Sequence, residues 1–587
     1  MMKRILKKCG KYWYLLLAVF LLAILQAISD IGLPTIMGDV IGHIQEAGGG
    51  QPDYTSKLIA GCILIVVFAI LSADSAVFIG MTASKLVSSI LADTRQEMYE
   101  HVDKFSMNEM NKFTTSSLLT RITNDFTNIN LTLNLGFRYI IYGPLVAIIA
   151  IILMLTPRER GASKPAWQLM LVVLGGLIII LALIIIIVKF VIAKMREIQK
   201  RNDHLTIVTR ESLEGLRVVR AYNAESYQEE KYAVINQSLT ELQIFTNKTL
   251  ALFQPTAVFV GGSLSLLVAW IGSFLVQDGT IQFKDITIYT QYCSLILIGI
   301  FMMIVVFVTM PRALTSAKRI YEVIDTPFSI VDAENPKEPT EVGTIEFKDV
   351  SYTYPGAEMP VVDHLSFKVE KGQTVAFIGA TGSGKSTVVN LLLRFFDATE
   401  GEILDDGANV NDYKLDDLFT RFGYVPQRGY LFHDSLKNNV CVGKTDATEE
   451  QLKRALDISQ SSDFVAKLPG GVEYEVSQGG KNVSGGQRQR LCIARAIIME
   501  PEIFVFDDSF SALDYRTDKI LRRTIKEQCA GTTNVIIAQR VGTIIDADQI
   551  IVLDGGKVVG QGTHDELLKK CDVYKEIADS QLGKEGK

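Results

Sequence analysis

The chain has 587 residues, a length that favours two or more domains over a single core. Hydrophobic residues make up 48% of it and charged residues 21%, which favours a membrane part joined to a soluble part. The net charge of -6 argues against nucleic acid as the main partner, and the seven cysteines include no CxxC pair, which argues against a disulfide framework or a zinc site.

Six stretches of the N-terminal half are apolar enough to cross a bilayer, because a helix needs about 20 apolar residues to span ~30 Å of hydrocarbon. They cover approximately residues 12–31, 58–81, 133–155, 167–192, 253–276 and 289–310. Four bases among the first eight residues predict a cytoplasmic N-terminus. The loop 156–166 carries three bases on the opposite side and disagrees with this orientation, whereas the other loops agree with it.

Two long gaps between these spans lack the residues that usually break helices. Residues 82–130 contain neither Gly nor Pro, and residues 193–249 contain only Gly215. We therefore expect the membrane helices to continue into the cytoplasm as two hairpins, each reaching ~35 Å below the bilayer at about 1.5 Å per residue. The alternative is a floppy polar loop in each gap.

From about Pro336 the pattern changes to that of a soluble α/β domain. Short apolar strands are expected at residues 374–378, 422–425, 503–507, 535–538 and 550–553, with amphipathic helices between them, and residues 343–354 alternate as a strand does. This order predicts a mainly parallel sheet. The expected domains are a membrane domain at 1–326, a linker at 327–339 and the α/β domain at 340–587.

A glycine-rich loop follows the strand at 374–378. It fits GxxxxGK[ST] and precedes a helical pattern at 387–395, which is the context that a phosphate-binding loop requires. Its residues are Gly379, Ala380, Thr381, Gly382, Ser383, Gly384, Lys385, Ser386 and Thr387. Its N–H groups and the positive end of the helix suit the phosphates of ATP, Lys385 is expected to reach the β- and γ-phosphates, and Ser386 to ligate Mg²⁺. Asp507, at the end of a buried strand, is expected to hold the same Mg²⁺ through water.

The segment around Ser484 resembles the LSGGQ signature of ATP-binding-cassette (ABC) proteins. It contains Ser484, Gly485, Gly486 and Gln487 in a row and is followed by a basic helix. By the same resemblance, which follows the family's order along the chain, Tyr354 stacks on adenine, Gln427 forms the glutamine loop and ligates Mg²⁺, and Asp514 belongs to the D-loop.

The resemblance extends to the six spans and the long inner stalks, and it covers nearly the whole chain. It implies an exporter-type half-transporter, with an α-helical membrane domain and an α/β P-loop nucleotide-binding domain of ABC type that hydrolyses ATP to drive transport. The implied location is the cell membrane, with the nucleotide-binding domain in the cytoplasm and the spans in the lipid bilayer. Residues 108–115 and 221–230 resemble the segments that couple the two domains.

In this family two nucleotide-binding domains face each other, and each ATP lies between the phosphate loop of one and the signature of the other. Ser484 and the amides of Gly485 and Gly486 would therefore contact ATP held by the partner chain.

Two catalytic positions depart from the family pattern. Asp508 stands where the family has a glutamate that polarises water, and Gln539 where it has a histidine that senses the γ-phosphate. The shorter carboxylate retreats by ~1 Å, which can cost on the order of a hundredfold in rate, and an amide cannot carry a proton. We expect a degenerate, slowly hydrolysing site beside an intact signature, which indicates a heterodimer with a second ABC half-transporter.

The leading functional hypothesis is ATP-driven export of amphipathic small molecules, as in multidrug exporters. Asp30 and Asp74 lie within apolar runs, where charges are costly and often functional, and either is a candidate to attract a cationic cargo. The alternatives are a siderophore importer on the same scaffold, a lipid or peptide exporter, and a regulatory subunit that binds ATP without driving transport.

Overall fold

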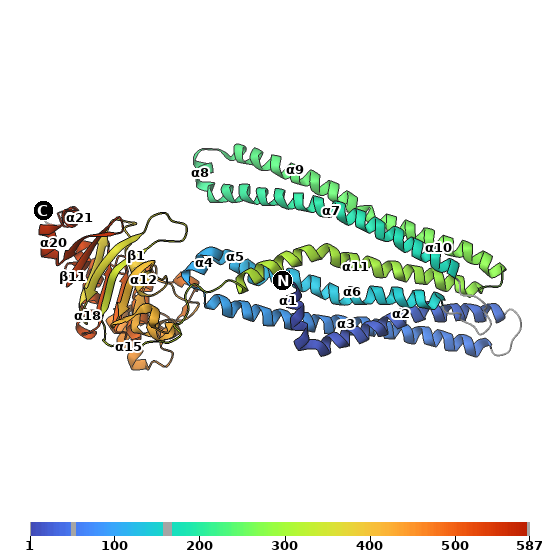
Figure 1. Ribbon diagram of the computed structural model, residues 1–587, viewed down its shortest axis with the longest axis horizontal. Helices are drawn as coiled ribbons and strands as arrows, with labels where there is room; N and C mark the ends of the chain where they lie inside the picture. Colours follow the sequence, from blue (N-terminus) through green and yellow to red (C-terminus); the bar gives the residue numbers. More distant parts are fainter. Residues whose placement is uncertain (1, 48–53, 156–166, 584–587) are drawn as a thin grey trace. The chain divides into compact units, whose positions relative to one another are not determined.

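The computed structural model describes residues 2–47, 54–155 and 167–583. The chain packs into two units, shown in Figure 1. The first comprises Met1–Asp103 and Thr114–Thr326, and the second comprises Lys104–Phe113 and Pro327–Lys587. The basic loop at 156–166 lies outside the described residues.

Long helices make up the first unit. In chain order its elements are α1 (Met2–Lys7), the 3-10 turn η1 (Lys8–Tyr12), α2 (Trp13–Ala47), α3 (Tyr54–Asp103), α5 (Thr115–Thr120), the π-helical turn η2 (Arg121–Asp125), α6 (Phe126–Leu155), α7 (Trp167–Glu214), α8 (Leu216–Ala221), α9 (Glu225–Ala251), α10 (Phe253–Gln277) and α11 (Phe283–Ile324). α3 has 50 residues and α11 has 42, about twice the length that a bilayer requires. Helix also fills most of the two gaps at 82–130 and 193–249, in place of floppy loops.

Five helices in the described part of the chain are long and apolar enough to cross a membrane. They are Met2–Gln45, Thr55–Asp103, Thr115–Met154, Val258–Gln277 and Phe283–Ile324. The fourth predicted span, 167–192, lies within α7, but the apolar portion that can be described there, Trp167–Gly176, is shorter than a span. Six spans are therefore not confirmed, and five are found.

Small residues and a carboxylate determine how the helices of the first unit meet. α6 and α11 touch backbone to backbone, because a Cβ atom on Gly143 would lie 2.8 Å from the carbonyl oxygen of Gly299. Asp30 on α2 accepts a hydrogen bond from the Tyr142 hydroxyl of α6 at 2.5 Å and another from the Ser72 hydroxyl of α3. Three helices thus converge on one carboxylate.

The second unit alternates strands and helices after the short helix α4. Its elements are α4 (Met107–Phe113), β1 (Ile345–Tyr352), β2 (Val362–Val369), β3 (Thr374–Gly379), α12 (Lys385–Leu392), β4 (Glu400–Asp405), β5 (Ala408–Asn409), η3 (Val410–Asp412), α13 (Leu415–Arg421), β6 (Phe422–Val425), β7 (Asp434–Ser435), α14 (Leu436–Val440), η4 (Cys441–Gly443), α15 (Glu449–Ile458), α16 (Ser462–Val465), η5 (Gly471–Glu473), β8 (Glu475–Val476), η6 (Gln478–Gly480), α17 (Gly485–Ile498), β9 (Ile503–Asp507), α18 (Tyr515–Gln528), β10 (Thr533–Ile537), α19 (Val541–Ile544), β11 (Gln549–Asp554), β12 (Lys557–Gly562), α20 (His564–Lys570) and α21 (Asp572–Leu582). α4 packs against the start of the following linker, where the backbone N–H of Ser329 donates to Glu109 at 3.1 Å.

The main sheet has the strand order β12-β11-β3-β10-β9-β6. Its inner pairs are parallel and only the β11–β12 pair is antiparallel, so the predicted mainly parallel sheet is confirmed. There is also a second, antiparallel sheet with the order β2-β1-β4-β5. Of its strands, the sequence analysis predicted only β1. Because parallel strands end at one edge, the segments that follow β3, β6, β9 and β10 meet there.

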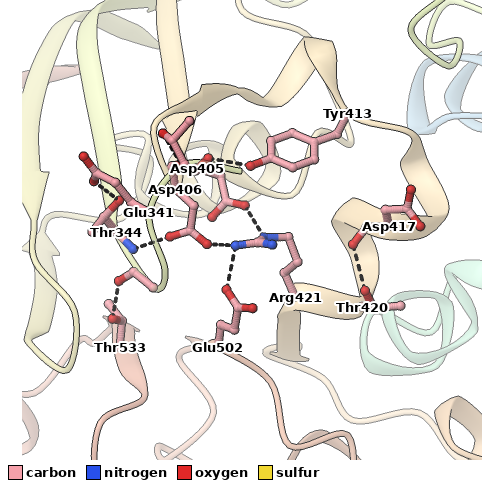
Figure 2. Close-up of polar contacts among 12 residues, drawn as sticks. Glu341, Thr344, Asp405, Asp406, Tyr413, Asp417, Thr420, Arg421, Glu502 and Thr533 are labelled. Atoms are coloured by element: carbon pink, nitrogen blue, oxygen red, sulfur yellow. Dashed lines mark hydrogen bonds and ion pairs between the residues drawn. The ribbon is translucent and has the colours of Figure 1, made fainter. Parts of the chain in front are cut away.

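The opposite edge of the main sheet is held by an ion cluster around Arg421, which Figure 2 shows. The guanidinium contacts the carboxylates of Asp405 at 2.7 Å and Glu502 at 2.6 Å, and that of Asp406 as well. Asp406 also accepts the backbone N–H of Thr344 at 2.6 Å. The cluster therefore joins the antiparallel sheet to the end of α13 and the start of β9.

Asp405 is fully buried in this cluster, and burial raises its pKa to about 6 from its ordinary 3.8. A carboxyl whose folded pKa is raised contributes stability below its unfolded pKa and loses that contribution as the pH rises through about 6. The shift of this pKa corresponds to a change of about 3 kcal/mol in the free energy of unfolding between low and neutral pH.

We predict that the thermal stability of the second unit, relative to that of the Asp405→Asn variant, increases as the pH falls from about 7.5 to about 5. The asparagine cannot titrate, so the offset between the two proteins should change with pH. The measurement is the melting temperature of this unit in the purified full chain at both pH values. Asp417→Asn, an exposed change on α13, is the control. An offset that is equal at both pH values contradicts the prediction.

Candidate functional site

The candidate site lies at the edge where β3, β6, β9 and β10 end. The strand register sets Asp507 of β9 beside Ile537 of β10, and Phe506 of β9 beside Val425 of β6. The glycine-rich loop leaves β3 at the same edge. Four strands that are far apart in sequence thus bring together the predicted loop, Gln427, the two aspartates and Gln539.

Two glycines allow the phosphate loop to turn tightly between β3 and α12. A Cβ atom on Gly379 would lie 2.0 Å from the carbonyl oxygen of Leu553, which leaves no room for a side chain. Gly384 has a φ of +95° and its Cβ would lie 2.6 Å from the carbonyl oxygen of Val361. The backbone N–H groups can therefore point into the loop as the sequence predicts.

Lys385 is folded back onto this loop. Its Nζ donates to the carbonyl oxygens of Gly379 at 2.9 Å and Ala380 at 2.7 Å, and to Ser383 Oγ at 3.3 Å. The side chain is buried, and burial lowers the pKa of the ammonium. An ammonium held by neutral acceptors in a buried loop suits an exchange of these partners for phosphate oxygens.

Ser386 and Asp507 form an oxygen pair next to the lysine. Ser386 Oγ donates to Asp507 Oδ1 at 3.1 Å. Burial raises the pKa of Asp507, the bond from Ser386 lowers it, and the neighbouring Asp508 charge raises it further. A hydroxyl and a carboxylate are the hard oxygen donors that Mg²⁺ takes, with phosphates and water completing its shell, so these residues fit the ion.

Asp508 has its carboxylate covered by two amides. Its Oδ2 accepts from Gln427 Nε2 at 3.1 Å and from Gln539 Nε2 at 2.8 Å. The residue is buried and has a φ of +47°, a conformation that aspartate tolerates better than most side chains. Gln427, expected as a Mg²⁺ ligand, directs its amide nitrogen to Asp508 in this structure.

Tyr354 follows β1, and its hydroxyl lies beside the start of α12, the helix that follows the loop. Its hydroxyl is 3.2 Å from Thr387 Oγ1. The ring packs edge-on against Tyr352 and Phe396, with centroids 4.9 and 5.4 Å away. A half-buried ring held in this way can offer a face to a flat aromatic base.

The signature segment begins α17 with a capping box. The backbone N–H of Gln487 donates to Ser484 Oγ at 3.2 Å, and the N–H of Ser484 donates to the Gln487 side chain at 2.9 Å. Gly485 faces open space, and a Cβ on Gly486 would meet only ordinary contacts. Among the described residues, no hydrogen bond or ion pair joins this segment to the phosphate loop.

Asp514 is in a similar position at the start of α18. It accepts the backbone N–H of Thr517 at 3.0 Å, and this bond lowers its pKa. Its bonding, like that of Ser484, is local to its own helix. The structure brings the loop, Asp507, Asp508, Gln427 and Gln539 together, and it leaves the signature and Asp514 exposed elsewhere on the unit.

Two polar residues that the sequence analysis missed tie these parts together. Gln489, buried on α17, accepts the backbone N–H of Gly429 at 3.1 Å and donates to the carbonyl oxygen of Pro426 at 3.0 Å. It therefore links the signature helix to the segment that holds Gln427. Ser509, also buried, donates to the carbonyl oxygen of Val425 at 2.8 Å. The signal for Gln489 was a glutamine on the inner face of the signature helix.

Two family models match the chain. One, described as the ABC transporter transmembrane region, covers residues 16–301, and the other, described as ABC transporter, covers residues 362–511. An uncharacterized ABC transporter ATP-binding protein of Mycobacterium tuberculosis is 33% identical over 577 residues, which cover 97% of this chain and 96% of the relative.

Relatives with named cargo are also similar to this chain. An ATP-dependent lipid A-core flippase of Pseudomonas fluorescens is 34% identical, with 70% of this chain and 68% of the relative covered. A putative multidrug export ATP-binding/permease protein of Bacillus subtilis is 27% identical, with 98% of each chain covered. The solved structure of a bacterial Atm1-family ABC exporter with ATP bound matches with a TM-score of 0.82 over 98% of each chain at 23% identity, a likeness of fold.

Proposed function

The chain belongs to the ABC transporter family, as an exporter-type half-transporter with ATPase activity, and from this premise we propose a narrower function. It forms a heterodimer with a second half-transporter and exports amphipathic small molecules of the multidrug type, driven mainly by ATP in the partner's site. Its own site holds Mg-ATP through Lys385, Ser386 and Asp507, and hydrolyses it slowly. The proposed organisation has six spans, with α7 as the fourth, and domain boundaries at 326 and 340.

The observation that carries this proposal is the pair of amides on Asp508. The carboxylate is one methylene shorter than glutamate, and its Oδ2 is bonded to Gln427 and Gln539. Water can reach that oxygen only if an amide leaves it. Gln539 can donate a hydrogen bond to a γ-phosphate but cannot accept and release a proton, so it supplies no acid–base chemistry.

The signature side of the chain supports a heterodimer. The capping box of Ser484 and Gln487 orients the start of α17, whose free N–H groups and positive dipole suit a γ-phosphate. This half of an ATP site thus retains its usual groups, whereas the half around Asp508 does not. In a homodimer both composite sites would contain Asp508, while in a heterodimer this signature serves a competent partner site.

We predict that the purified chain alone hydrolyses ATP at about one hundredth of the rate of the assembled pair, the loss that a ~1 Å displacement of the base can cause. The measurement is steady-state phosphate release in lipid nanodiscs at saturating Mg-ATP. Candidate partners are half-transporters with a glutamate at the position that corresponds to Asp508. Hydrolysis by the chain alone that equals the rate of the pair contradicts the heterodimer proposal.

A second prediction concerns Asp508→Glu. The longer side chain returns the carboxylate by ~1 Å, so single-turnover hydrolysis in this site should rise by on the order of tenfold, less than the full displacement cost because Gln539 still carries no proton. The measurement uses the pair with the partner's site disabled. Asp508→Asn, which removes the charge at nearly constant shape, should not raise the rate. An unchanged rate in Asp508→Glu would show that carboxylate reach does not limit hydrolysis.

The polar cluster in the membrane helices supports a cationic cargo. Asp30 receives hydrogen bonds from Tyr142 and Ser72, and no ion pair to it occurs among the described residues. Asp74, by contrast, lies exposed on a face of α3 with Val77 and Phe78, which are 59% and 53% exposed. Of the two aspartates, we propose Asp30 as the one that attracts a positively charged cargo, because no cation among its described contacts competes with a ligand for the carboxylate.

We predict that Asp30→Asn lowers uptake of a cationic dye into inverted vesicles by about tenfold, the equivalent of about 1.4 kcal/mol of charge attraction. Basal ATP hydrolysis should change less than about twofold, and Asp74→Asn is the matched control. Equal effects of the two substitutions, or unchanged dye uptake in Asp30→Asn, would remove Asp30 from the cargo site.

Lipid export is the second candidate function, favoured by the similarity to a lipid A-core flippase. A fluorescent phospholipid tested in the same vesicles distinguishes the two candidates. Movement of the lipid without movement of the dye would favour the second candidate.

A further inference from the structure

The C-terminal helix α21 packs directly against the segment that carries Gln539. Tyr574 and Ala578 of α21 are buried in the same apolar cluster as Val541 and Ile544 of α19. The Tyr574 hydroxyl also bonds His564 Nδ1 at 2.7 Å, which ties α21 to α20. Residues 574, 578 and 581 lie on one face of α21. Gln581 therefore faces the backbone at 539–541.

Gln581 makes two reciprocal hydrogen bonds with that backbone. Its Nε2 donates to the carbonyl oxygen of Gln539 at 2.9 Å, and its Oε1 accepts the N–H of Val541 at 2.8 Å. Val541 is the first residue of α19, and its N–H has no partner within the helix. The N-cap residue, Arg540, provides no side-chain cap. Gln581 thus supplies, from another helix, the cap that the local sequence lacks.

The two bonds hold the backbone immediately around Gln539. The carbonyl of Gln539 and the N–H two residues later are both fixed, which limits rotation of the peptide units between them. The Gln539 side chain then reaches Asp508 Oδ2 at 2.8 Å. A chain of contacts therefore runs from α21 through the 539–541 backbone to the carboxylate beside the phosphate loop.

We infer that Gln581 is a positioning residue for ATP hydrolysis, which acts through Gln539 and makes the C-terminal helix part of the nucleotide site. The inference rests on the proposed role of Gln539 as a hydrogen-bond donor to the γ-phosphate, a role in which its amide has left Asp508. Gln581 itself contacts neither the loop nor Asp508 among the described contacts. Its effect should therefore fall on the rate of hydrolysis and leave ATP binding through Lys385 and Tyr354 unchanged.

The test uses single-turnover hydrolysis by the full-length transporter in its native assembly. The phase that is lost in a Lys385→Ala variant reports this chain's site, whatever its absolute rate. We expect Gln581→Ala to slow that phase by about fivefold without a change in the ATP concentration at half-saturation, because the bonds to the 539–541 backbone are lost. Ser580→Ala, an exposed neighbour on α21, should leave the phase unchanged.

Two further variants separate positioning from a general loss of structure. Gln581→Glu keeps the acceptor for the Val541 N–H but loses the donor to the Gln539 carbonyl. This variant should therefore slow the phase no more than Gln581→Ala does. In a Gln539→Ala background, Gln581→Ala should slow the phase no further, since the residue through which it acts is gone. Hydrogen exchange at the Val541 amide should accelerate in Gln581→Ala and not in Ser580→Ala.

Two results would overturn the inference. One is an unchanged phase in Gln581→Ala although exchange at Val541 has accelerated, because the contact would then exist without acting on hydrolysis. The other is an equal slowing by Gln581→Ala with and without Gln539. A fast phase in the parent protein would contradict the slow site proposed above. The ratio of the variant rate to the parent rate, on which this inference depends, would still be measurable.

Discussion

The two amide hydrogen bonds on the Asp508 carboxylate constrain the whole nucleotide site. They draw Gln427, from the end of β6, and Gln539, from the end of β10, onto the residue that follows β9. In doing so they occupy one of the two carboxylate oxygens that could polarise a water molecule. Neither amide can exchange a proton, which is one basis of the slow hydrolysis proposed above.

The rest of the second unit holds this arrangement in place from both ends of β9. At the start of the strand, Glu502 belongs to the buried Arg421 cluster that fastens the antiparallel sheet to the main sheet. At its end, Asp507 binds Ser386 of the phosphate loop. Gln489 connects the signature helix to the segment of Gln427, and Gln581 connects the C-terminal helix to that of Gln539. Hydrogen bonds therefore lead from the nucleotide site in two directions, one toward the signature helix and one toward α21.

Much of the site could be predicted from the sequence because its parts are local motifs. The phosphate loop, the buried strand that ends in Asp507 and the Ser-Gly-Gly-Gln run each carry their meaning within a few residues, and the parallel sheet follows from the alternation of strands and helices. Asp508 and Gln539 were recognised as departures, but their contact with each other depends on which strands are neighbours in the sheet. Gln489 and Gln581 are glutamines on helices, and only tertiary packing distinguishes them from solvated side chains.

The membrane part shows the same division. Apolar runs predict most of the spans, yet the sequence alone treats Asp30 and Asp74 alike, because hydropathy carries no information on which face of a helix a residue occupies. The contacts from Tyr142 and Ser72 separate them. The fourth predicted span lies within α7 and is not among the five spans found in the described residues.

The most direct test of the slow site is the chemical state of the nucleotide on each subunit after one turnover. The assembled transporter would be loaded with a radiolabelled, photo-cross-linkable ATP analogue, allowed to turn over once and irradiated, and the nucleotide on each chain then identified as triphosphate or diphosphate. The account predicts intact triphosphate at the phosphate loop of this chain when the partner's loop already holds diphosphate. Equal conversion on both chains would contradict it.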